Sequence, residues 1–168
     1  MNLRRPVVGV AAALALGAGV LAWQSMATLE PAPEVSYTLL DGSSGSTSAL
    51  KGKVVLVNFW ATSCVTCVHE MPQIVATHNK FKDRGFETLA VAMSYDPPAY
   101  VSKFAQTRQL PFNVAIDNTG QIARRFGDIQ LTPTTFLLDQ QGRIVKRYVG
   151  EPDFAALHAL VEDLLKKG

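Results

Sequence analysis

Two cysteines stand three positions apart, between a buried-strand pattern and a helical pattern. Residues 53–60 (KVVLVNFW) form a continuous β-branched and aromatic run, which is typical of a central strand buried on both faces. Residues 64–84 are predicted to form a helix that ends at Gly85. The spacing puts the sulfur atoms of Cys64 and Cys67 on the first helical turn, within bonding distance of each other. The sequence therefore predicts a dithiol or disulfide at the point where a central strand leads into a helix.

The remaining segments alternate between strand and helix patterns, which is typical of an α/β sheet in one domain. Residues 41–48 are rich in Gly and Ser and are predicted to be a turn, and residues 140–142 a hairpin turn. The expected strands are 35–40, 53–60, 86–93, 112–116, 134–139 and 143–149. Further helices are expected at 98–109 and 120–126, and a last helix is expected to start near Pro152, at a first-turn position.

The N-terminal segment, residues 1–27, is predicted to be a signal peptide or an uncleaved membrane anchor. Arg4 and Arg5 precede an uninterrupted run of Val, Ala, Leu and Gly. The segment ends in SMA, which resembles a small-x-small cleavage site. The apolar run is nearly long enough to span a membrane, so a cleaved signal peptide and a membrane anchor both stay open. Residues 28–34 are predicted to be a short Pro-rich linker, and residues 35–168 the exported domain.

The charge balance excludes one class of partner. The formal net charge is +2, and without Arg4 and Arg5 the chain has 14 basic and 14 acidic side chains. A neutral body has no electrostatic reason to bind nucleic acid, so no nucleic-acid partner is expected.

A bridge between cysteines this close together would restrict the unfolded chain only weakly, so we expect the pair to serve chemistry rather than stability.

The position of Cys64 at a helix N-terminus favours its thiolate, because unpaired backbone N–H groups and the helix dipole stabilise negative charge there. The thiolate is the attacking species. We expect Cys64 to attack a substrate disulfide and Cys67, one turn further in, to resolve the mixed disulfide.

The alternatives to a redox pair are half of a zinc site, a copper site and an inert buried pair. The chain has no second Cys-x-x-Cys, and the spacing of His69, His78 and His158 does not suit a metal, so no metal is expected.

The sequence around the cysteines resembles the active site of the TlpA/ResA-like family within the thioredoxin superfamily. Residues 51–62 (KGKVVLVNFWAT), the CVTC motif and EMP at residues 70–72 carry the resemblance, which covers about residues 35–167. It implies a thioredoxin-like fold, with a central mixed β-sheet flanked by helices and an extra helix and strand within residues 98–117. It also implies a thiol–disulfide oxidoreductase of the bacterial periplasm or of the outer face of the cytoplasmic membrane.

The resemblance also indicates which residues contact a substrate. It places a cis-proline at Pro133, facing the cysteines, with Thr132 offering backbone groups to an extended polypeptide. Trp60 and Ser63 flank the motif and are further candidates. The family usually has Trp where this chain has Ser63, and often Pro where it has Thr66, so the choice of partner and the direction of electron flow stay open.

Glu70 is the candidate acid–base group. It lies three residues after Cys67, on roughly the same helix face, and the resemblance implies that it assists the active site. Plain thioredoxins carry a buried Asp where this chain has Asn58, which cannot accept a proton. The alternative is an ordinary solvated glutamate in the first helical turn.

Together these features favour an exported protein-disulfide oxidoreductase that acts as a reductant and is supplied by a membrane electron donor. The resemblance allows two roles, cytochrome c maturation and general thiol maintenance. One alternative is a peroxidase of the peroxiredoxin group, whose pattern needs Thr where this chain has Ala61, while Thr62 is one position off. The other is a thioredoxin-fold module that binds copper or another metal. No cofactor is expected.

Overall fold

Strand β3 is the middle strand of a five-stranded sheet in the computed structural model, which describes residues 29–167. The strands are β3 (Val54–Trp60), β4 (Phe86–Ala92), β5 (Asn113–Ile116), β6 (Thr134–Leu138) and β7 (Ile144–Val149). Their order is β5-β4-β3-β6-β7. The first three are parallel to one another, whereas β6 runs antiparallel to β3 and β7 antiparallel to β6. This is the central mixed sheet expected from the sequence.

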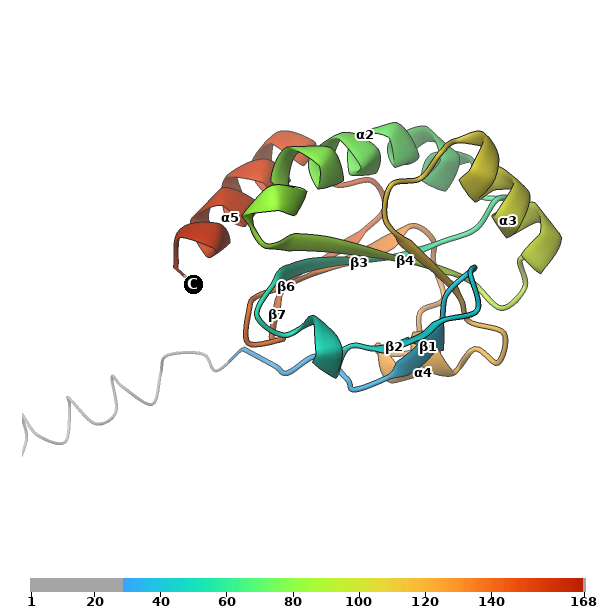
Figure 1. Ribbon diagram of the computed structural model, residues 1–168, viewed down its shortest axis with the longest axis horizontal. Helices are drawn as coiled ribbons and strands as arrows, with labels where there is room; N and C mark the ends of the chain where they lie inside the picture. The colour runs from blue at the N-terminus through green and yellow to red at the C-terminus, as the bar shows by residue number, and fades with distance from the viewer. Residues whose placement is uncertain (1–28, 168) are drawn as a thin grey trace, which may run out of the picture.

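Helices cover both faces of the sheet (Figure 1). One face carries α2 (Val65–Phe81), α3 (Pro98–Thr107) and α5 (Phe154–Lys166). The other carries α4 (Gln121–Arg125), the short helix η1 (Ser48–Leu50) and a ribbon of β1 (Ser36–Thr38) and β2 (Ser44–Ser46). The short helix η2 (Lys82–Arg84) continues α2 as far as Gly85, whose left-handed φ of 89° ends it. The expected extra helix and strand are α3 and β5.

Alternation along β3 decides which of its side chains face the helix that follows it. Leu56 and Trp60 pack in the core cluster that contains α2 and α5, whereas Val57 and Phe59 pack in the cluster on the other face. Asn58 lies on the same side as Leu56 and Trp60, because side chains two positions apart share a face, and it is fully buried. A polar group is therefore presented to the underside of α2.

The segment 41–48, expected to be a turn, contains strand β2, which pairs antiparallel with β1. Its Ser and Gly residues carry no strand signal in the sequence. The ring of Tyr37 in β1 lies so close to Gly45 that any Cβ there would collide with it. The strand is therefore selected by packing against Tyr37 rather than by its own composition.

The predicted linker is attached to the domain over much of its length. The N–H of Ala32 donates to Gly142 O at 2.8 Å, and the N–H of Ile144 donates to Glu30 O at 2.7 Å. These bonds join Glu30 and Ala32 to the start of the edge strand β7, whose backbone groups on that side have no other strand of the described sheet as a neighbour. Glu30 and Ala32, predicted to lie in a linker, are thus hydrogen-bonded to the sheet.

The predicted signal peptide or anchor, residues 1–27, lies outside the described residues. Between Leu29 and Lys167, no helix combines the length and apolar character needed to cross a membrane. Export therefore stays a prediction from the sequence.

The last helix begins after Pro152 rather than on it. Asp153 is the N-cap of α5, and its Oδ1 accepts hydrogen bonds from the N–H groups of Ala155 at 2.9 Å and Ala156 at 3.1 Å. A carboxylate that satisfies two of the unpaired N–H groups is a strong helix start. Pro152 consequently precedes the cap instead of occupying the first turn.

Candidate active site

Three loops lie together at one end of the central strands, because the strand directions bring their ends to the same side of the sheet. β3 and β4 are parallel, so their C-terminal ends lie side by side, and Trp60 pairs with Ala92. β6 runs antiparallel to β3, so it starts where β3 ends, and Phe59 pairs with Thr134. The loops that follow β3, follow β4 and precede β6 are therefore neighbours although they are far apart in the chain.

Cys64 and Cys67 form a disulfide at the start of α2, with 5.2 Å between their Cα atoms. Cys64 is the N-cap residue, and its Sγ accepts a hydrogen bond from the backbone N–H of Cys67 at 3.1 Å. This N–H is one of those that a helix leaves unpaired, so it would also stabilise a thiolate on Cys64. Cys67 has no exposed surface, whereas Cys64 is partly exposed. An incoming protein can therefore reach only the first sulfur.

The loop before β6 supplies the facing wall. The Thr132–Pro133 peptide bond is cis, as expected. The carbonyl oxygen of Thr132 lies 3.6 Å from Cys64 Sγ. Within residues 29–167, no backbone hydrogen bond engages the N–H or the C=O of Thr132. Both groups are free to pair with an extended polypeptide laid against the disulfide.

Glu70 is buried one helical turn after Cys67. Its side chain has no exposed surface, so the alternative of a solvated glutamate is wrong. Oε1 accepts a hydrogen bond from Asn58 Nδ2 at 2.9 Å, and the same Nδ2 donates to Thr135 Oγ1 at 2.9 Å. Oε2 has no hydrogen-bond partner in the described part of the chain. The carboxyl group is thus held by β3 beneath the start of α2.

Burial raises the pKa of Glu70 to about 7, from an ordinary value of 4.5. The hydrogen bond from Asn58 opposes this increase, and the negative charge of Glu151 adds to it. A carboxyl group with a pKa near neutrality can both hold and release a proton under ordinary conditions. The site therefore combines an accessible sulfur, a buried second sulfur and a group that can exchange a proton.

Two of the residues predicted to contact substrate lie in different environments. Trp60 has no exposed surface, and its ring centroid lies 5.1 Å from that of Phe104 in α3. It therefore cannot touch a substrate in this conformation, which corrects the prediction: the face of β3 that carries it is covered by helices. Ser63 is exposed directly before Cys64 and stays a candidate contact.

The loop between β4 and α3 borders the site, although no motif in the sequence predicted it. Asp96 is 2% exposed, and its carboxylate accepts hydrogen bonds from the N–H of Thr62 at 2.5 Å and from its Oγ1 at 2.6 Å. The hydroxyl of Tyr95 lies 3.3 Å from Thr132 Oγ1. One signal was present, because both residues follow a second predicted central strand, and loops at the C-terminal ends of neighbouring parallel strands commonly form sites.

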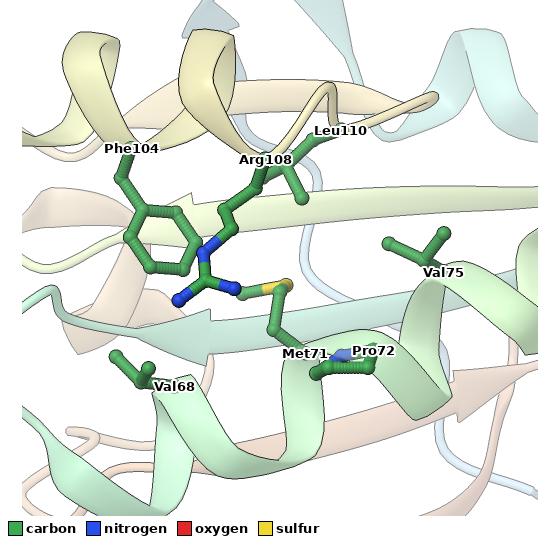
Figure 2. Close-up of a pocket in the computed structure, with 7 residues that line it drawn as sticks. All are labelled: Val68, Met71, Pro72, Val75, Phe104, Arg108 and Leu110. Atoms are coloured by element: carbon green, nitrogen blue, oxygen red, sulfur yellow. The ribbon is translucent and has the colours of Figure 1, made fainter.

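A cavity of about 240 Å³ lies between α2 and α3 (Figure 2). Val68, Met71, Pro72 and Val75 line it from α2, Phe104 from α3, and Arg108 and Leu110 from the segment directly after α3. The walls are mostly apolar, and none of the active-site residues described above contributes to them. This cavity is separate from the disulfide.

No group of three or more His, Cys, Asp or Glu side chains is arranged to hold a metal ion anywhere in residues 29–167. His78 and His158 are hydrogen-bonded to threonine hydroxyls, and His69 Nδ1 lies 3.1 Å from Glu151.

Comparison with known proteins gives consistent similarities. The family model described as Redoxin matches residues 28–161. The thiol-disulfide oxidoreductase ResA of Bacillus thuringiensis subsp. konkukian (strain 97-27) is 37% identical over 136 residues, which is 81% of this chain and 75% of the relative. The solution structure of a putative thioredoxin from Neisseria meningitidis matches with a TM-score of 0.77 and 39% identity, covering 84% of this chain and 93% of the other. A thiol:disulfide interchange protein of the thioredoxin family from Chlorobium tepidum TLS matches with a TM-score of 0.76 and 30% identity, covering 84% and 99%.

These similarities agree with the geometry of the site. The matched region includes the mixed sheet, α2 and the cysteine pair at its start. The solved relatives confirm the thioredoxin-like fold expected from the sequence. The chain belongs to the Redoxin family and is a thiol–disulfide oxidoreductase of the TlpA/ResA-like type, with Cys64 and Cys67 as its redox pair.

Proposed function

We propose that this protein is exported and reduces disulfides of other proteins, with electrons supplied by a membrane donor. The observation that carries the proposal is the asymmetry of the pair: Cys64 is partly exposed opposite the Thr132 carbonyl, while Cys67 is fully buried. Such a pair attacks with one sulfur and resolves with the other. The two candidate roles are cytochrome c maturation and general thiol maintenance.

The proposed reaction has two exchange steps. The Cys64 thiolate attacks one sulfur of a substrate disulfide, so that a Cys64–substrate bond forms and the other substrate sulfur leaves as a thiolate. The Cys67 thiolate then attacks Cys64 Sγ, the Cys64–Cys67 bond forms, and the second substrate sulfur leaves. Two electrons pass to the substrate, whose thiolates take up protons, and the membrane donor restores the dithiol.

Glu70 is the proposed proton acceptor for Cys67. Residues three apart on a helix are neighbours, and both side chains are fully buried on the inner side of α2. With a pKa of about 7, the Glu70 carboxylate can take the thiol proton of Cys67 before the resolving step. Asn58 fixes the orientation of the carboxyl group without titrating itself.

The charge of Glu70 also favours a donor role. A carboxylate one turn from the cysteines disfavours their thiolates, which destabilises the reduced pair relative to the disulfide. We expect a reduction potential nearer to that of thioredoxin, about −270 mV, than to that of a strong periplasmic oxidant, about −120 mV. Equilibration of the protein with dithiol buffers followed by thiol trapping measures it. Glu70→Gln is expected to raise the potential by about 30 mV, and a wild-type value near −120 mV would contradict the donor role.

Export is supported by the sequence of residues 1–27, in which two arginines precede an apolar run without acidic residues. Disulfides persist in proteins outside the cytoplasm, whereas cytosolic thiols are kept reduced. A segment like residues 1–27 directs a protein out of the cytoplasm. Protein disulfides, the substrates of such a reductant, are found in that same compartment.

Replacement of Cys67 by alanine is expected to trap the partners of the enzyme. Cys64 keeps its place at the start of α2 and can still attack, but no internal thiol releases the mixed disulfide. Expressed in a cell with a periplasm, the variant should accumulate protein adducts that survive denaturation without reductant and vanish with it. Mass spectrometry of the adducts identifies the partners.

The matched control is the double variant Cys64→Ser with Cys67→Ala, which lacks the attacking sulfur and should form no adducts. Apocytochromes c among the trapped proteins would support the maturation role, and a broad set of exported proteins would support thiol maintenance. A trap that recovers cytosolic proteins, or no proteins at all, would contradict the proposal.

A further inference from the structure

The loop between β4 and α3 is anchored to the active-site loop. Asp96 is almost fully buried, and both of its carboxylate oxygens accept hydrogen bonds from Thr62, two residues before Cys64. The N–H of Asp96 donates to Met93 O at 2.9 Å, which closes a turn at the end of β4. Charge-assisted bonds in a buried position are among the stronger ones in proteins. Tyr95, inside this turn, therefore has a defined position relative to the disulfide.

Tyr95 bridges from this turn to the facing wall of the site. Its hydroxyl is hydrogen-bonded to Thr132 Oγ1 at 3.3 Å, and the carbonyl of the same Thr132 lies 3.6 Å from Cys64 Sγ. The Tyr95 side chain is nevertheless 59% exposed. A tyrosine held at its hydroxyl end and uncovered along its ring presents a fixed apolar face to whatever lies against Thr132.

The two chain segments next to the disulfide also carry exposed apolar side chains and no charge of their own, although Lys103 and Arg108 line a hollow with Thr62. Val65 is 84% exposed directly after Cys64, and Leu131 is 64% exposed directly before Thr132. Residues 62–68 contain no charged side chain, and neither do residues 129–135. A charged group brought between these two segments would lose water without gaining a charged partner from either of them, which is costly.

We propose that Tyr95 is a specificity-determining contact, selecting extended polypeptides that carry an apolar side chain beside the reacting cysteine. This inference rests on the proposed function and adds the chemistry of the preferred substrate. The substrate segment pairs with the backbone of Thr132, and the side chain next to its cysteine packs on the Tyr95 ring together with Leu131. Neither the cysteine motif nor the cis-proline by itself supplies this preference.

Two synthetic peptides that differ only in the residue before their single cysteine test the proposal. One has leucine and the other aspartate, and each cysteine carries a thionitrobenzoate group. The Cys64 thiolate attacks the peptide sulfur, and the coloured thionitrobenzoate anion leaves, because the sulfur with the lower pKa leaves faster. The reduced wild-type protein is expected to react about tenfold faster with the leucine peptide. Tyr95→Ala is expected to lower this ratio to about threefold or less, whereas Tyr95→Phe, which keeps the ring but loses the bond to Thr132 Oγ1, is expected to keep a ratio clearly above that of Tyr95→Ala.

The matched control is Tyr100→Ala, which removes another exposed tyrosine, one that makes no hydrogen bond to residues 131–133. It should leave the ratio of the two rates as in the wild type. An unchanged ratio in Tyr95→Ala, an equal loss of rate for both peptides, or a ratio in Tyr95→Phe as low as that in Tyr95→Ala would each overturn the assignment. A wild-type protein that reacts with neither peptide would instead contradict the proposed function.

Discussion

Replacement of Cys64 by serine is expected to abolish disulfide reduction, lowering turnover by at least about a thousandfold, as loss of a covalent nucleophile does in other enzymes. Cys67 cannot take over the attack, because it has no exposed surface and lies one turn inside α2. The measurement is reduction of a protein disulfide such as that of insulin, with dithiothreitol as the electron source.

Alkylation of the reduced wild-type protein at neutral pH provides the control for this assignment. Iodoacetamide should label Cys64 much faster than Cys67, because only Cys64 combines access with the helix N-terminus. Equal labelling of the two cysteines, or substantial activity left in Cys64→Ser, would show that the attacking sulfur has been assigned to the wrong residue.

The second large effect concerns stability, and it depends on pH. Glu70→Gln removes a buried carboxyl group whose pKa is raised to about 7 in the folded protein. At pH 4 the carboxyl is largely protonated in both the folded and the unfolded chain, so its raised pKa changes the free energy of unfolding little at that pH. Between about pH 4.5 and 7 the unfolded chain releases the proton and the folded protein keeps it, so the wild type loses stability as the pH rises. Relative to Glu70→Gln, this loss should reach about 3 kcal/mol above pH 7.

Urea unfolding of the oxidised protein at several pH values measures this difference, since the disulfide keeps the cysteines from titrating. The matched control is Glu34→Gln, which removes an exposed carboxylate and should give a difference that changes little with pH. A flat difference for Glu70→Gln would mean that Glu70 ionises as readily in the fold as in the unfolded chain. In that case the proposed proton transfer to Glu70 would lose its basis.

The burial of Glu70 follows a periodic pattern that is visible in the sequence. The buried residues of α2 recur every three or four positions, and they include Cys67, Glu70, Ile74 and Phe81. A glutamate at a position on that stripe is expected to point inward, and a buried carboxyl group needs a hydrogen-bond donor. The donor is Asn58, whose place on the same side of β3 as Trp60 also follows from alternation.

Other features could not be predicted from local patterns. Trp60 belongs to the family motif next to the cysteines, yet its ring is covered by α3, which begins almost forty residues later in the chain. Strand β2 has no strand propensity and forms because Tyr37 packs over Gly45. The burial of Trp60 and the formation of β2 are thus both decided by contacts between distant segments, not by the neighbouring residues in the chain.

The sequence by itself determined the central strand, the helix that starts at the cysteines, the redox pair and the proline that faces it. Each of these depends on local periodicity, on a helix terminus or on a motif, which are properties of adjacent residues. Only the tertiary structure decided which groups surround the disulfide. Parallel β4 and antiparallel β6 bring Tyr95, Asp96 and Thr132 to the end of β3, and burial beneath α2 raises the pKa of Glu70. Strand direction and burial arise from pairing and packing between distant segments, so the surroundings of Cys64 exist only once the sheet has formed.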